Sequence, residues 1–387
     1  MKAATWLIAA CLASAAAWAA DPVATALPGQ RPPPGSDEDE LWYAMERAER
    51  DLLQHPQLVR DPELNAYVRD VACRVAGDHC PDLRVYIVEQ PWFNASMAPN
   101  GMLVVWTGAL LRFQDEAELA LVLGHELAHF RERHAIRQWR KAKNTSAVIG
   151  SISLLAFGGG AGAAGYLANF LGVAGMSQFS RDAERQSDDL GFAAAVGQGY
   201  EPAAGARLWQ RMKAEEDARG YGKPIPVFAS HPRTAERLAD IQAAAKRYDG
   251  GGLSGRDAYQ AAVRPFLVQW LEGELSRRMY DTSVQVIGDL RALADPGLEA
   301  TYAYFLAEAL RRRGKDGDAA RAQALYEEAV ALPDPPAGAL REHGMALRAQ
   351  GDREGAGAAF RRYLAMAPEA GDAAFVRQYL AQMQATP

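Results

Sequence analysis

The stretch that decides the fold of this chain is Leu121-Val122-Leu123-Gly124-His125-Glu126-Leu127-Ala128-His129-Phe130, an apolar helical pattern that contains two histidines and a glutamate. Residues four apart lie on one face of a helix, so His125 and His129 can offer two nitrogens to a single metal ion, with Glu126 at the edge of that face. Burying these groups without a partner would be costly, and a metal ion removes that cost. The spacing is the H-E-x-x-H pattern of a zinc peptidase helix.

The alternative is that these histidines are hydrogen-bonded core residues, which is the commoner fate of a histidine on an apolar helix. The chain has only seven histidines, and three of them, His125, His129 and His134, fall within ten positions. This clustering favours a metal site over an ordinary core.

The length and charge of the chain limit the classes of protein to consider. At 387 residues the chain is too long for one ordinary hydrophobic core, and we expect two or more domains. The net charge is −6 at pH 7, and the basic residues are mixed with acidic ones. Because nucleic-acid-binding proteins concentrate lysine and arginine in a patch or stripe, we expect no nucleic-acid partner.

Residues 1–20 have the pattern of a secretory signal peptide. Lys2 is followed by an uncharged run rich in alanine and leucine, and Ala17-Trp18-Ala19 is a small-x-small cleavage pattern. We expect cleavage near Ala19 or Ala20, and therefore export. Cys11 resembles a lipoprotein acylation site, but the apolar stretch before it is short, so we do not expect lipidation.

Cleavage of the signal peptide leaves two cysteines in the mature chain, Cys73 and Cys80. Because disulfides persist in oxidising compartments, we expect these two residues to form one, and two free thiols are the alternative. Residues 21–36 contain five prolines and little apolar content, and we expect a disordered linker there.

Residues 37–250 are expected to form a zincin-like peptidase domain of mainly α, α+β class. Apolar spacing between residues 37 and 75 predicts two or three amphipathic helices broken at Pro56 and Pro62. Residues 84–88 and 101–106 have the composition of strands, and the segment between them reads as a loop. A small β-sheet therefore precedes the H-E-x-x-H helix.

Two histidines leave a catalytic zinc one protein ligand short, and a second helix is the usual source of the third. The segment Arg181 to Gly191 supplies a candidate in Glu184. Asp188, four residues later on the same helical face, could accept the ring N–H of a ligand histidine and fix its orientation. The alternative is that both residues belong to a solvated charged face.

Taken together, these motifs resemble the zinc metallopeptidase family that includes HtpX and the CAAX prenyl endopeptidase, and most of all its BepA-like members. The resemblance covers roughly residues 40–245 and rests on several motifs in order: Asn94-Ala95, Pro99-Asn100-Gly101, Thr107 to Leu111, Glu118-Leu119-Ala120, His125 to His129, His134, Ser180 to Asp188, and His231-Pro232 with Arg237. Ser96 and Ser187 depart from the family's usual aromatic residue and alanine, which concerns local packing only.

The resemblance implies one Zn²⁺ per chain, bound by His125, His129 and Glu184, with Glu126 as general base. It also implies a periplasmic location, unfolded or misassembled envelope proteins as substrates, and the outer-membrane assembly machinery as a candidate partner. We expect the substrate to add as a strand to the sheet edge near the residues Met102, Val104 and Trp106.

His231 has two candidate roles in such a site. It could donate a hydrogen bond to the oxyanion of the reaction, or it could occupy the open zinc position until a client displaces its loop. The alternative is a residue at the start of a helix, ahead of Pro232, because proline favours the first helical turn.

Between Asn144 and Ser180 the chain has no charged side chain and is rich in glycine and alanine. Three structures fit this segment: a buried helical hairpin, an apolar surface that contacts a bilayer or a membrane-bound client, and a transmembrane hairpin. We favour the first because glycines divide the segment into two short halves. Peripheral membrane contact through residues 144–180 stays open.

Residues 255–387 are expected to form a tetratricopeptide-like helical repeat domain. Two stretches of this region align at close to a 34-residue helix-turn-helix period, with Gly314 matched to Gly351 and Tyr326 to Phe360. Tyr259 to Leu293 reads as a degenerate first repeat. The alternative is an ordinary helical bundle.

The sequence thus predicts an exported zinc metalloendopeptidase whose repeats recruit protein clients. Two other functions stay open. One is a chaperone or assembly factor with a largely latent peptidase, and the other is an integral membrane peptidase that uses residues 144–180 as spans.

Overall fold

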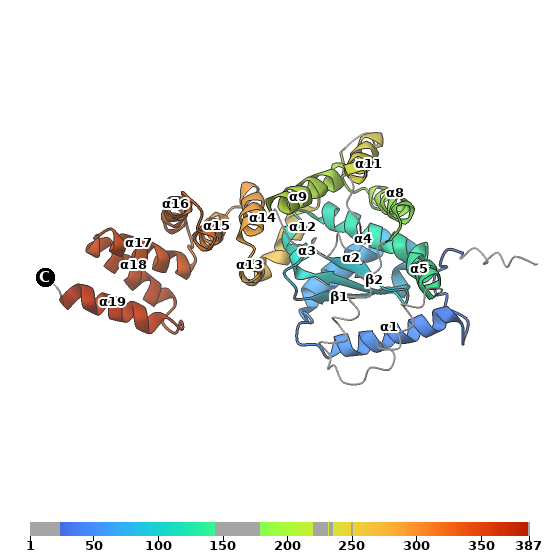
Figure 1. Ribbon diagram of the computed structural model, residues 1–387, viewed down its shortest axis with the longest axis horizontal. Helices are drawn as coiled ribbons and strands as arrows, with labels where there is room; N and C mark the ends of the chain where they lie inside the picture. The colour runs from blue at the N-terminus through green and yellow to red at the C-terminus, as the bar shows by residue number, and fades with distance from the viewer. Residues whose placement is uncertain (1–23, 144–178, 220–230, 232–234, 249–250, 386–387) are drawn as a thin grey trace, which may run out of the picture.

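The computed structural model describes residues 24–143, 179–219, 231, 235–248 and 251–385. A small sheet surrounded by helices forms one part of the molecule, and a row of helices extends from it to the C-terminus (Figure 1). The predicted signal peptide, Cys11 and nearly all of the uncharged segment lie outside the described residues. None of the helices within these ranges is long and apolar enough to cross a membrane.

Two helices precede the sheet, α1 (Asp37–Leu53) and α2 (Pro62–Ala76). Each begins at a side chain that caps the first turn: Ser36 and Asp61 both accept a hydrogen bond from a backbone N–H three residues later. Such caps satisfy amide groups that have no partner within the helix. Both helices lie in the region where the apolar spacing predicts them.

The sheet has three strands, β1 (Arg84–Val88), β2 (Ala95–Met97) and β3 (Met102–Trp106), in the order β1-β3-β2. β1 is parallel to β3, and β2 is antiparallel to it. β1 and β3 match the predicted strands. β2 lies in the segment predicted as a loop, because three residues are too few to show an alternating pattern.

The central position of β3 corrects one prediction. Met102, Val104 and Trp106 do not offer a sheet edge to a substrate, because the backbone of β3 already pairs with β1 on one side and with β2 on the other. Their side chains are buried and pack with Leu41 and Met45 of α1. β3 consists of apolar residues only, which is typical of a strand that is buried on both faces of its sheet. Among the described residues, β2 pairs with β3 alone.

The helices that complete this part are α3 (Thr107–Arg112), α4 (Glu116–Arg131), α5 (His134–Lys143), α8 (Arg181–Gly197), α9 (Ala203–Arg219) and α11 (Ala235–Arg247). α4 and α8 touch backbone to backbone at Gly124 and Gly191. A Cβ atom added to Gly191 would lie 2.5 Å from the backbone nitrogen of His125, which is too close for any side chain. The two glycines therefore let α8 bring its side chains directly beside those of α4.

The described segment before α1 contacts the end of α4, and the two cysteines pair near the end of α2. Residues 24–36, within the predicted linker, form no helix or strand, and the N–H of Ala26 donates to the carbonyl of Arg131 at 2.7 Å. Cys73, near the end of α2, forms a disulfide with Cys80 in the following 3-10 helix (Gly77–Asp82).

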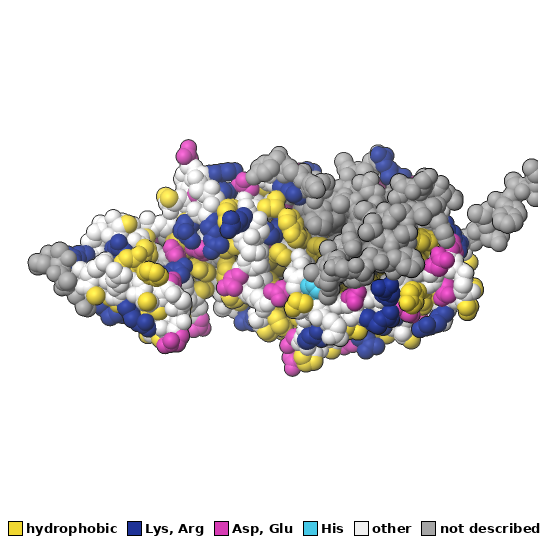
Figure 2. All heavy atoms as spheres, turned by 60° about the horizontal axis from the view of Figure 1, so that its bottom comes forward, with side chains coloured by type: hydrophobic (Ala, Val, Ile, Leu, Met, Phe, Trp, Pro, Cys, Tyr) yellow, Lys and Arg dark blue, Asp and Glu magenta, His cyan; other side chains and the backbone are white. Residues whose placement is uncertain are grey.

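The C-terminal part is helical throughout: α12 (Arg256–Val263), the 3-10 turn Arg264–Phe266, α13 (Leu267–Ser276), α14 (Tyr280–Ala292), α15 (Glu299–Arg313), α16 (Asp318–Ala331), α17 (Ala337–Ala349), α18 (Arg353–Met366) and α19 (Ala373–Ala385). α15 packs with α16, and α17 packs with α18. The turns within these pairs contain Gly314 and Gly351, whose φ angles of 67° and 85° favour glycine. On the face shown in Figure 2, basic side chains lie among acidic and hydrophobic ones in both parts.

α12 belongs to the packing of the first part, although its sequence lies in the predicted repeat region. Tyr259 is fully buried, and its hydroxyl donates to the carbonyl of Leu110 in α3. Its ring lies against those of Tyr67 and Phe113. The C-terminal helices are thus joined to the first part through a shared core.

Candidate metal centre

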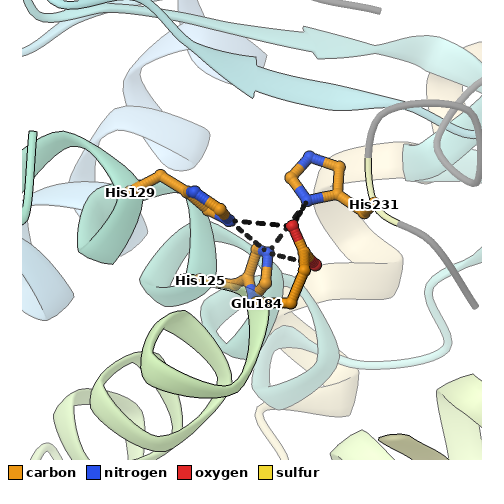
Figure 3. A group of neighbouring side chains, drawn as sticks. All are labelled: His125, His129, Glu184 and His231. Atoms are coloured by element: carbon orange, nitrogen blue, oxygen red, sulfur yellow. Dashed lines mark hydrogen bonds and ion pairs between the residues drawn. The ribbon is translucent and has the colours of Figure 1, made fainter. Parts of the chain in front are cut away.

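Four buried side chains converge beside the crossing of α4 and α8 (Figure 3): His125 and His129 from α4, Glu184 from α8, and His231 from the segment before α11. Each offers one donor atom, and these atoms all lie within 4.8 Å of one another. Imidazoles and a carboxylate collected in one buried place can share a metal ion, which offsets the cost of removing them from water.

The spacing of the donors fits a tetrahedral zinc site. The Nε2 atoms of His125 and His129 are 3.0 Å apart. Glu184 Oε1 lies 3.5 Å from His129 Nε2, and its Oε2 lies 3.7 Å from His125 Nε2. Zinc bonds of about 2.0–2.2 Å in tetrahedral geometry separate neighbouring ligand atoms by roughly 3.3–3.6 Å. Small adjustments of these side chains would therefore suffice to hold the ion.

His231 joins this group through one ring nitrogen. Its Nδ1 lies 2.9 Å from Glu184 Oε1 and 3.2 Å from His125 Nε2. Its other nitrogen, Nε2, lies 3.6 Å from Glu126 Oε1. Nδ1 is therefore placed where a fourth metal donor would lie, and Nε2 faces the residue expected to act as general base.

Asp188 makes the contact that the sequence suggests for it. It lies one turn after Glu184 on α8, and its Oδ1 is 2.8 Å from His125 Nδ1. With Nε2 turned toward the other donors, the ring proton of His125 lies on Nδ1 and is donated to Asp188. Such a carboxylate fixes both the orientation and the tautomer of a metal-binding histidine.

A second chain of contacts, which the sequence does not predict, orients His129. His134 Nδ1 lies 3.1 Å from His129 Nδ1, and His134 Nε2 lies 3.0 Å from Gln186 Oε1. Burial lowers the pKa of the His134 imidazole, so this ring is neutral at pH 7. One consistent set of tautomers follows: His129 donates from Nδ1 to His134, and His134 donates from Nε2 to Gln186.

His134 belongs to the histidine cluster that the sequence singles out, but Gln186 carries no such signal. Gln186 Nε2 donates in turn to Glu132 Oε2 at 2.8 Å, just after the end of α4. Only the folded crossing of α4 and α8 reveals that these residues act together.

Glu126 lies beside the converging donors without being one of them. Its side chain is buried and borders a cavity that His125, Asp188 and His231 also line. A carboxylate that is close to a metal but does not bind it can take a proton from a water molecule at the metal.

Residues 58–245 match the model of peptidase family M48. These residues are a peptidase family M48 domain. The domain runs from just before α2 into α11 and contains all four converging side chains together with Glu126. Metallopeptidases of this family use zinc, which agrees with the donor set and its spacing. The family resemblance and the cofactor predicted from the sequence are both confirmed.

Curated relatives are similar to about half of this chain at low identity. A putative β-barrel assembly-enhancing protease of Vibrio cholerae is 28% identical over 208 residues, which cover 51% of this chain and 43% of the relative. The β-barrel assembly-enhancing protease of Escherichia coli K12 is 29% identical over 204 residues, 50% of this chain and 41% of the relative. The mitochondrial metalloendopeptidase OMA1 of Schizosaccharomyces pombe is 31% identical over 184 residues, 46% of this chain and 51% of the relative. The chain thus spans about half the length of these relatives or less.

Proposed function

We propose that this protein is an exported zinc metalloendopeptidase that cleaves peptide bonds of unfolded or misassembled envelope proteins. The observation that carries the proposal is the convergence of His125, His129 and Glu184 inside an M48 domain, with Glu126 beside them. The names of the bacterial relatives, which refer to β-barrel assembly, support an envelope client and a role near the outer-membrane assembly machinery.

In the proposed mechanism, the residues around the metal site have separate roles. A zinc ion held by His125, His129 and Glu184 would supply a Lewis acid able to lower the pKa of a water molecule and to polarise the scissile carbonyl. Glu126 takes the proton of the attacking water and then delivers it to the amine that leaves. Asp188 and His134 hold the rings of His125 and His129 in the orientation that directs Nε2 toward the ion.

The free side of β2 is the best candidate for binding the substrate backbone, in place of β3. A peptide in extended conformation can add to a sheet edge through main-chain hydrogen bonds. Among the described residues β2 pairs with β3 on one side alone, so its other side supports the assignment of β2 as the strand that receives the peptide.

The disulfide and the C-terminal helices support the rest of the assignment. The Cys73–Cys80 bond fits an oxidising compartment, such as the periplasm. The helix pairs α15–α16 and α17–α18, each with a glycine turn, support a tetratricopeptide-like repeat region that recruits clients. Residues 1–20 would be the signal peptide, residues 37–250 the peptidase domain and residues 255–387 the repeat region.

The zinc content of the purified mature protein tests the metal site. We expect one zinc ion per chain. We expect Glu184→Ala to lower zinc affinity by about 100-fold or more, because the loss of a ligand lowers metal affinity at least as much as the loss of a residue that orients a ligand. Zinc would be measured by mass spectrometry after dialysis against a chelator that fixes the free zinc concentration.

The matched control is Asp189→Ala, since Asp189 lies on the same helix but is exposed and, within the part of the chain that the structure describes, pairs with Arg247 alone, across 3.4 Å. Full zinc content in Glu184→Ala would remove Glu184 from the site. Loss of zinc in both variants would indicate a general defect of α8 rather than the loss of a ligand.

His231 is proposed as a fourth zinc ligand that a substrate must displace, since its Nδ1 belongs to the donor group. If only a small fraction of the molecules has His231 away from the metal site and can therefore bind substrate, His231→Ala should raise kcat/KM for a short peptide by about tenfold or more. Peptide cleavage at several substrate concentrations would measure the effect. A tenfold loss would instead assign His231 to the oxyanion, and unchanged cleavage at every concentration would exclude both roles.

A further inference from the structure

The loop of residues 89–94, between β1 and β2, contacts the C-terminal helices at two places. Gln269 of α13 donates from Nε2 to Glu89 Oε1 at 2.7 Å. Arg277, the residue after α13, places its guanidinium carbon 4.1 Å from the centre of the Trp92 ring. β2 follows this loop directly, so the segment that leads into β2 is held by the start of the C-terminal part.

We infer that Arg277 and Trp92 are positioning residues, through which the C-terminal helices hold β2 in place for peptide binding. The inference rests on the proposed function, in which β2 receives the substrate backbone. β2 has only three residues and, within the described part of the chain, pairs with β3 alone. So short a strand gains little from its own hydrogen bonds, and its position therefore depends on the segments that flank it.

Arg277 is a fixed point for this loop. Its side chain is 1% exposed and lies 2.7 Å from the carboxylate of Glu274 and 3.5 Å from that of Glu215. A buried guanidinium that left both carboxylates would lose their compensation, so the charges keep it in place. The attraction between a cation and the face of an aromatic ring is greatest for tryptophan and where water is excluded. Trp92 is therefore held at the end of α13.

The other end of the loop leads to the sheet and to the metal site. Phe93 is buried and lines the cavity beside Glu126. The carbonyl of Asn94 accepts a hydrogen bond from the N–H of Trp106 at 3.0 Å, where the pairing of β2 with β3 begins. Because one residue spans at most about 3.6 Å, the chain between Trp92 and Asn94 has no slack in which a shift of the tryptophan could be lost.

The loop also lies directly against the start of α3. A Cβ atom at Gly108 would collide with the backbone of Pro91 and Trp92, and the N–H of Gly108 donates to the carbonyl of Gln90 at 2.7 Å. The loop therefore cannot give way toward α3. A displacement of Trp92 passes along the chain to β2 instead.

The location of the metal site decides which step of the reaction this contact affects. The converging donors His125, His129 and Glu184 lie on α4 and α8, as does Glu126, and none of them lies on β2. Loss of the contact between Arg277 and Trp92 should therefore weaken peptide binding and leave zinc binding and the chemical step intact. A change of this kind raises KM without lowering kcat.

The variant Trp92→Leu tests the inference, because leucine keeps an apolar side chain but has no ring. With a short peptide, which needs no recruitment by the C-terminal helices, we expect KM to rise by about tenfold while kcat stays within about twofold. Trp92→Phe keeps a ring face and should recover part of the loss. Zinc content should be unchanged in both variants. Hydrogen–deuterium exchange should become faster in Trp92→Leu for the amides of residues 95–97 but not for those of residues 84–88.

Two further variants show whether the contact itself is responsible. Tyr43→Leu replaces an exposed aromatic residue of α1 and should change none of these measurements. Arg277→Met removes the same contact from its other side, so it should raise KM alone but add less than about twofold to Trp92→Leu.

Additive effects of Trp92→Leu and Arg277→Met on KM would overturn the inference. So would a loss confined to kcat, or unchanged exchange at residues 95–97. If the wild-type protein shows no cleavage that depends on zinc and on Glu126, the proposed function fails, and the exchange rates alone then decide whether Trp92 holds β2.

Discussion

Replacing Glu126 with glutamine is expected to lower kcat for peptide hydrolysis by about 10²–10⁴-fold while the protein still binds one zinc ion. Glutamine has nearly the same shape, but its amide cannot take a proton from water or return it to the leaving amine. Glu126 lies outside the group of four donor residues, so its charge is not needed to hold the ion. Its side chain is buried, and its Oε1 lies 3.6 Å from His231 Nε2.

The measurement combines kcat on an unfolded protein substrate with zinc content and a thermal unfolding curve. Glu63→Gln is the matched control, because Glu63 lies exposed in the first turn of α2 and the same change there should alter none of the three. Cleavage that persists in Glu126→Gln would exclude Glu126 as the general base. A variant that no longer cleaves but still prevents aggregation of the client would favour the chaperone function.

The parts of the site that depend on local spacing could be predicted from the sequence. His125 and His129 share a helical face whatever the rest of the fold, and Glu184 followed by Asp188 repeats the same spacing on α8. The chemistry of zinc, which needs a third protein ligand, then links the two helices. This link between the two helices does not depend on how they cross.

The parts that depend on long-range packing could not be predicted in this way. Gly124 and Gly191 look like ordinary glycines in helical patterns, yet their contact sets the distance between α4 and α8. Gln186 has no motif of its own, and it acquires a role only because α8 places it 3.0 Å from His134. The register of a three-residue strand such as β2 is likewise fixed by its neighbour rather than by its own sequence.

The junction between the M48 domain and the C-terminal helices contains a cluster of buried charges that no sequence pattern indicates. Arg112 of α3 contacts Glu215 of α9 and Glu274 of α13, in both cases at 2.7 Å. Arg277 also contacts Glu274 at 2.7 Å and lies 4.1 Å from the centre of the Trp92 ring. The four charged side chains are almost completely buried, and two positive charges balance two negative ones.

The charges of this cluster stabilise one another. Burial alone would lower the pKa of Arg112, but Glu215 and Glu274 raise it well above its ordinary value. Burial alone would raise the pKa of Glu274, but Arg112 and Arg277 lower it. Removing one of these four side chains therefore leaves a buried charge that no opposite charge balances. Since α9 also lines the cavity beside Glu126, the cluster joins one wall of that cavity to the C-terminal helices.

We therefore expect Arg112→Met to lower the free energy of unfolding by about 3–5 kcal/mol, the usual cost of breaking a buried ion pair from one side. Arg112→Met combined with Glu215→Gln should recover part of this loss, because the remaining buried charges again sum to zero. Urea unfolding followed by tryptophan fluorescence would measure the free energy of unfolding of the wild-type protein and of each variant. The control is Lys213→Met, also on α9, which removes an exposed partner of Asp217 and should cost no more than about 1 kcal/mol. If Arg112→Met costs as little as this control, or if the double variant is less stable than the single one, the buried cluster does not hold the junction together.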